Sequence, residues 1–106
     1  MLRGMSLTSR QQRQTASELR THLDAIGLSE EVVSSDLGFT SERLVRTLSV
    51  TNSGDPGDVW LLRDYLVQAA ADKGVVVAPF TILTDASRRQ AAVWFNLRSA
   101  PRHHFH

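Results

Sequence analysis

The segment from Glu30 to Leu48 constrains the fold of this chain most strongly, because it predicts two short helices joined by a tight turn. Ser29 and Thr40 stand where the two helices would begin, and both residue types cap helices well. Gly38 lies between the helices and can adopt the left-handed backbone conformation that a sharp turn requires. The apolar residues placed to close the angle between the helices are Val33, Leu37, Phe39 and Leu44.

A longer helix is predicted before this corner and another after it. Thr8 precedes the first one in a capping-box pattern, and Gly27 supplies its stop. Asp55 and Pro56 are a strong start signal for the second, which is apolar on most sides and runs to Gly74. We therefore expect this second long helix to lie at the centre of the core.

The last third of the chain is less regular. Residues 75–83 contain a β-branched run and Pro79, which predict a short extended segment or small wing. Thr84 can cap a final helix that reaches about Phe95. Residues 98–106 offer little to pack and are expected to form a flexible tail. The fold class predicted for residues 1–106 is a single, mainly α domain of about five helices.

Charge is distributed unevenly along the chain. The net charge is +1, but residues 1–20 and 85–106 each carry four arginines and one acid. Residues 21–84 hold nine acids and four bases, a net charge of −5. The predicted corner therefore lies in the most acidic stretch, so any affinity for nucleic acid has to draw on terminal arginines, especially Arg10, Arg13, Arg88 and Arg89.

Composition excludes several classes of site. The chain contains no cysteine, which rules out disulfides, thiolate metal sites and thiol nucleophiles. It has no apolar run of the roughly 20 residues that a membrane span needs, and its first residues lack a secretory pattern. We expect a cytoplasmic protein with no membrane partner.

The corner resembles the helix-turn-helix of phage-repressor-like DNA-binding domains. In that class the second helix enters the major groove, so the resemblance implies double-stranded DNA as a partner. The positions that would meet DNA are Thr40, Ser41, Glu42, Arg43, Val45 and Arg46. Arg46 would pair with guanine, and Arg43 would lie near a phosphate. A homodimer is expected from the two half-sites that such modules need and from the β-branched residues 75–77.

The acidic middle of the chain supports a rival interpretation, in which the corner is a degenerate helix-turn-helix used for protein contacts without catalysis. A ligand-responsive regulator is a third possibility and requires a pocket near Trp60 or Trp94. Cofactors and catalysis are not expected, because the sequence has no glycine-rich phosphate loop and no nucleophile motif.

Over nearly its full length the chain is also similar to a small family of uncharacterised bacterial proteins that are grouped only as a domain of unknown function. The residues that carry this similarity are 36–40, 58–66, 79–85 and Trp94-Phe95. The similarity implies no activity. It does imply that the whole chain is one recurring unit.

Histidines and aromatic residues leave two smaller questions open. His103, His104 and His106 resemble a metal-binding tail, but a tail without a carboxylate is more often an adventitious chelator, so no metal site is predicted. His22 is expected at the surface or at a cap. The aromatic side chains, which suit core packing better than ligand stacking, are Trp60, Tyr65, Trp94 and Phe95.

Overall fold

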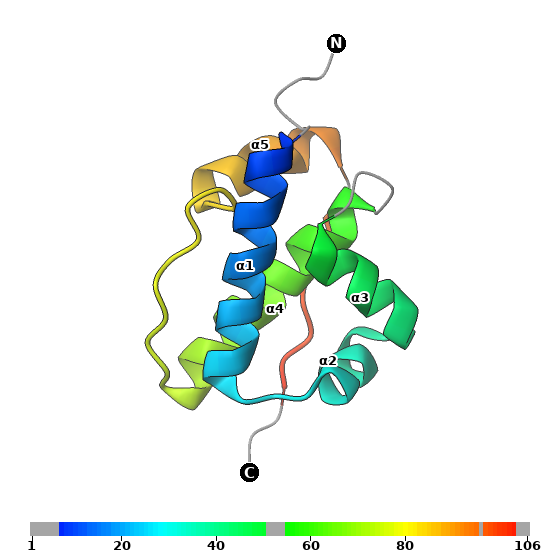
Figure 1. Ribbon diagram of the computed structural model, residues 1–106, viewed down its shortest axis with the longest axis vertical. Coiled ribbons are helices and arrows are strands. Elements are labelled where there is room, and N and C mark those ends of the chain that lie inside the picture. Colours follow the sequence, from blue (N-terminus) through cyan, green and yellow to red (C-terminus); the bar gives the residue numbers. More distant parts are fainter. Residues whose placement is uncertain (1–6, 51–54, 96, 104–106) are drawn as a thin grey trace.

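The protein is a bundle of five helices (Figure 1), seen in a computed structural model that describes residues 7–50, 55–95 and 97–103. The helices are α1 (Ser9–Ile26), α2 (Glu30–Leu37), α3 (Ser41–Ser49), α4 (Pro56–Lys73) and α5 (Asp85–Trp94). The described ranges contain no strand, so the predicted mainly α fold is confirmed. Among these helices, none is both long enough and apolar enough to cross a bilayer.

Helix boundaries follow local capping chemistry. The Thr8 hydroxyl accepts a hydrogen bond from the backbone N–H of Gln11, and the Thr8 N–H donates to the side-chain oxygen of Gln11, which completes the predicted capping box. Asp55 caps α4 ahead of Pro56. Helices α1, α2 and α4 each end on a glycine with positive φ, as the sequence predicts.

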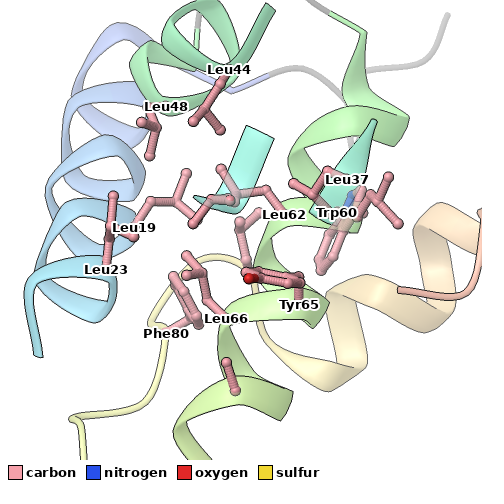
Figure 2. Packing of buried hydrophobic residues seen from close by; sticks show 14 of the residues in the cluster. Leu19, Leu23, Leu37, Leu44, Leu48, Trp60, Leu62, Tyr65, Leu66 and Phe80 are labelled. Atoms are coloured by element: carbon pink, nitrogen blue, oxygen red, sulfur yellow. The ribbon is translucent and has the colours of Figure 1, made fainter. Parts of the chain in front are cut away.

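The hydrophobic core lies between α1, α3 and α4 (Figure 2). Leu19 and Leu23 come from α1, and Leu44 and Leu48 come from α3. Helix α4 contributes more buried residues than any other helix, which confirms its predicted central place. The core residues of α4 are Trp60, Leu61, Leu62, Tyr65, Leu66, Ala69 and Ala70.

The connection from α4 to α5 is irregular and contains no strand, so of the two alternatives predicted for residues 75–83, a short extended segment or a small wing, the wing is wrong. A strand needs a neighbouring strand to satisfy its backbone, and the described residues offer none. Instead the Thr81 N–H donates to the Glu18 carboxylate at 3.1 Å, and its hydroxyl donates to the same group at 2.7 Å. Phe80 and Leu83 are buried and hold the connection against the core, whereas Val76 is 97% exposed.

Residues 97–103 differ from the expected tail, because they lie against α4. Leu97 and Ala100 pack on the core, and Gln68 of α4 donates to the carbonyl oxygens of Ala100 and Pro101. Arg102 forms an ion pair with Asp72 at 2.8 Å. The expectation that this segment has little to pack against is therefore wrong up to His103, and residues 104–106 lie outside the described ranges.

Candidate functional site

Helices α2 and α3 are joined by the three-residue turn Gly38-Phe39-Thr40. Gly38 has a φ of 72°, and the Phe39 N–H after it donates to the Ser34 carbonyl at 2.9 Å. The Thr40 hydroxyl accepts from the Arg43 N–H at 3.1 Å and so caps α3. The two helices and their turn therefore have the lengths and caps that the sequence predicts for this corner.

Helix α3 is strongly two-sided. Its buried side packs Leu44, Thr47 and Leu48 on the core. Its other side is exposed, and it carries every helix residue predicted to meet DNA except Arg43. Val45 on this side is 50% exposed. The exposed residues on this outer face of α3 are Ser41, Glu42, Val45, Arg46 and Ser49. A helix side of this kind is accessible to a partner.

Arg43 is the exception, because Asp58 of α4 holds its guanidinium. Arg43 Nε donates to Asp58 Oδ2 and Nη2 donates to Oδ1, each at 2.8 Å, and the guanidinium stacks 4.2 Å from the centre of the Phe39 ring. The hydrogen bonds to Asp58 outweigh burial and raise the pKa of Arg43. Arg98 reaches the same carboxylate at 3.0 Å. Asp55 caps α4, as predicted, whereas the Asp58 carboxylate pairs with both Arg43 and Arg98.

The other arginines divide into two groups. Arg88, one of the terminal arginines named for nucleic-acid affinity, is paired with Asp64 at 2.7 Å. Among the residues that the structure describes, four arginines have no carboxylate partner: Arg10, Arg13, Arg46 and Arg89. Arg10 and Arg13 lie in the first turns of α1, and Arg89 lies on α5, which crosses that same end of the molecule in Figure 1.

A second polar cluster joins α2, α4 and the carboxyl-terminal segment. The Tyr65 hydroxyl donates to Asp36 Oδ2 at 2.5 Å, and His103 Nδ1 lies 2.7 Å from the same oxygen. Burial and the bond to Asp36 raise the pKa of Tyr65 far above its usual range. His103 therefore has a carboxylate beside it, which the sequence did not reveal, because 67 residues separate the two.

No metal site is built around that histidine in the described part of the chain, where no three ligand-type side chains gather. His104 and His106 lie outside the described residues. His22 is buried and stacks on Phe80 with 4.1 Å between ring centres, so its predicted surface position is wrong.

The aromatic residues separate into core and surface. Trp60 and Tyr65 are buried, and Phe95 packs on the edge of the core, as predicted. Trp94 is 53% exposed, so its predicted core position is wrong. The buried residue of α5 is Ala91 and not Trp94.

Comparison with known proteins gives a family and no assigned activity. Neither a curated protein nor a solved structure matches the chain. Residues 5–96 match the family described as uncharacterized protein conserved in bacteria (DUF2316). This range takes in all five helices, including the outer face of α3 and the whole of α5. The chain belongs to this bacterial family.

Proposed function

We propose that this protein is a small DNA-binding, transcription-regulatory protein that uses α2 and α3 as a helix-turn-helix and acts as a homodimer. The observation that carries the proposal is the outer face of α3, where Arg46 is exposed and has no carboxylate partner among the described residues. A short, capped helix with one exposed side is what the major groove of DNA admits.

Four of the five residues on the outer face of α3 can make a contact that suits a base pair. Arg46 can donate two hydrogen bonds to guanine, and Ser41 can contact a base or a phosphate. Val45 can pack on a thymine methyl group, and Glu42 can accept from the amino group of cytosine. These four side chains would read the sequence, whereas Thr40 is used by the cap of α3.

Phosphate contacts would come from outside α3. Arg43, which the sequence assigned to a phosphate, is held by Asp58 through two hydrogen bonds. Arg10 and Arg13 of α1 are exposed and lack carboxylate partners among the described residues, so they can supply positive charge to the DNA backbone. With these two phosphate contacts per subunit, the logarithm of affinity should fall with the logarithm of salt concentration with a slope of about −2 per subunit.

Fluorescence anisotropy with mixed genomic duplexes at low and moderate salt tests the proposal. Arg46→Ala should weaken binding about tenfold or more, because a bidentate arginine contact contributes roughly 1–3 kcal/mol. Arg46→Lys should keep the salt dependence and lose discrimination between sequences, since lysine lacks the planar fork. The matched control is Arg102→Ala. It removes the same charge from the carboxyl-terminal segment, where Arg102 pairs with Asp72 near the end of α4, and this variant should bind DNA as the wild type does.

A protein-interaction module is the second candidate. It is favoured by the Arg43–Asp58 pair, which removes one of the two arginines of α3 from any DNA contact, and by the exposed Glu42 on the same helix. On this account wild type shows no salt-dependent DNA binding and Arg46→Ala changes nothing in the titration. Either result would overturn the DNA proposal.

A further inference from the structure

Residues 97–103, which follow the range that matches the family, are attached to the bundle largely by charge. We call this segment the clasp, and in Figure 1 it is the red segment beside α4. Each of its three basic side chains faces an acid of α2 or α4. The nitrogen-to-oxygen distances are 3.0 Å for Arg98–Asp58, 2.8 Å for Arg102–Asp72 and 2.7 Å for His103–Asp36.

Two of these ion pairs reach the corner that α2 and α3 form. Asp36 lies in the last turn of α2, next to the turn that leads into α3. Asp58 also accepts two hydrogen bonds from Arg43 of α3. The ion pair of Arg102, in contrast, joins the clasp to α4 alone. The clasp therefore meets the acids that link both helices of the corner to α4.

Helix α2 depends on links of this kind because it is short. It has eight residues, and isolated helices of fewer than about 12 residues are marginal in water. The polar links from α2 to α1, α4 and the clasp that the described residues show are Arg20–Glu30, Tyr65–Asp36 and His103–Asp36. Both side chains of the first link are more than 40% exposed, so that link is weak. Asp36 is therefore the main polar anchor of α2.

We propose that the clasp controls how often α2 leaves the bundle, so that the carboxyl-terminal segment regulates the opening of the corner. Tyr65 and His103 reach the same oxygen of Asp36, one from α4 and the other from the clasp. When the clasp is displaced, α2 keeps the bond to Tyr65 and loses the charged one. Salt screens ion pairs, so high ionic strength displaces the clasp. The inference goes beyond the proposed function, because it concerns the corner whichever partner the corner binds.

The clasp can be tested by substitution, because the acids that it covers keep other partners. Without Arg98, Asp58 still accepts both hydrogen bonds from Arg43. Without His103, Asp36 still accepts the hydrogen bond from Tyr65. A buried acid that loses every partner is strongly destabilising, and neither substitution creates one. We therefore expect variants at Arg98 and His103 to fold.

Amide hydrogen exchange of the full chain, followed by NMR at about pH 5.5, where an ordinary histidine is protonated, measures the opening of α2. Arg98→Ala/His103→Ala should speed exchange at residues 33–38 about tenfold relative to the amides of α4, because it removes a charge-assisted hydrogen bond to α2. Arg102→Ala is the matched control. It removes an exposed pair that joins only α4, so exchange in α2 should stay within about twofold of wild type.

Two further comparisons separate the clasp from a general loss of stability. Asp36→Asn keeps an acceptor for the Tyr65 hydroxyl and removes the charge that His103 faces. Adding His103→Ala to Asp36→Asn should therefore speed exchange in α2 less than about twofold. Raising the salt concentration from about 0.05 to about 1 M should speed exchange in α2 of wild type several times, and that of Arg98→Ala/His103→Ala much less.

Unchanged exchange in α2 of Arg98→Ala/His103→Ala would overturn the proposal, as would equal acceleration in α2 and α4, which indicates global unfolding. An equal effect of His103→Ala with and without Asp36→Asn would overturn the role of that ion pair. These measurements contain no DNA. A protein that binds no DNA can therefore retain the clasp, and one that binds DNA can lack it, so the two proposals fail separately.

Discussion

At the scale of single residues, the surroundings of Arg43 matter more than its position on α3. Helical spacing places it beside Arg46, and both look available for phosphate or base contacts. In the structure its guanidinium is bidentate on Asp58, whose side chain is 6% exposed, and it also covers the Phe39 ring. Arg43 therefore joins α3 to α4, whereas Arg46 is exposed and has no carboxylate partner among the described residues.

Tyr65 permits a direct test of the polar cluster around Asp36, because it is the one tyrosine in the chain. Burial and the hydrogen bond to Asp36 disfavour its phenolate and raise its pKa. In an absorbance titration we expect no phenolate signal near pH 10, where an exposed tyrosine ionises, until the protein unfolds. Asp36→Asn should lower the midpoint. A phenolate signal near pH 10 from folded protein would contradict the buried pair.

At the scale of elements, the turn between α2 and α3 requires a left-handed backbone conformation at Gly38. Gly38 has a φ of 72°, and a Cβ added there would meet nothing within 4 Å. Substitution is therefore opposed by left-handed strain and not by a clash. The turn sets the orientation of α3 relative to α2, so this glycine controls how the outer face of α3 is presented.

We predict that Gly38→Ala lowers the free energy of unfolding by about 1 kcal/mol, measured by urea denaturation. Gly38→Asn should lower it less, since asparagine tolerates the left-handed conformation better than alanine does. Equal losses in the two variants would point to a contact at this position instead of backbone strain.

At the scale of the whole molecule, side chains far apart in sequence hold the outer segments to the bundle. Glu18 of α1 accepts both hydrogen bonds from Thr81 in the connection between α4 and α5. Arg63, whose side chain is 10% exposed, binds the carbonyl of Leu83 and the carboxylate of Asp85. Ionised carboxylates therefore help hold residues 81–85 against α1 and α4.

Acid should weaken this arrangement. Burial opposes ionisation of Glu18, but hydrogen bonds from Thr81 and Gln14 outweigh it and hold its pKa below the ordinary 4.5. The hydrogen bond and charge of Arg63 hold the pKa of Asp85 below the ordinary 3.8. Both carboxyls thus have a lower pKa in the folded protein than in the unfolded chain. The stability that they contribute is fully present above the unfolded-state pKa and is lost as the pH falls through the folded-state pKa.

We therefore predict that the thermal midpoint of wild type falls steeply between about pH 5 and pH 2.5, and that a Glu18→Gln/Asp85→Asn variant falls less over that range. At pH 7 the variant should be less stable than wild type. Scanning calorimetry at a series of pH values measures both effects. Parallel curves for the two proteins would show that these carboxylates do not carry the acid sensitivity.

Local sequence was sufficient for the helices, their ends and the central place of α4. Caps, glycine stops and apolar periodicity act over a few residues, so Thr8, Gly38 and Asp55 could be interpreted without a partner in view. The exposed side of α3 followed from the same periodicity. Four of its predicted contact residues are exposed as expected, namely Ser41, Glu42, Val45 and Arg46.

The contacts between distant residues were set by tertiary packing. Asp58 meets Arg43 across 15 residues and Arg98 across 40, and Asp36 meets His103 across 67. No local rule pairs such residues, because the packing of α2, α3 and the carboxyl-terminal segment on α4 brings them together. The sequence by itself thus determined the helices and their apolar sides. Which arginines are neutralised, and which apolar residues of α5 stay in solvent, depended on how those helices pack.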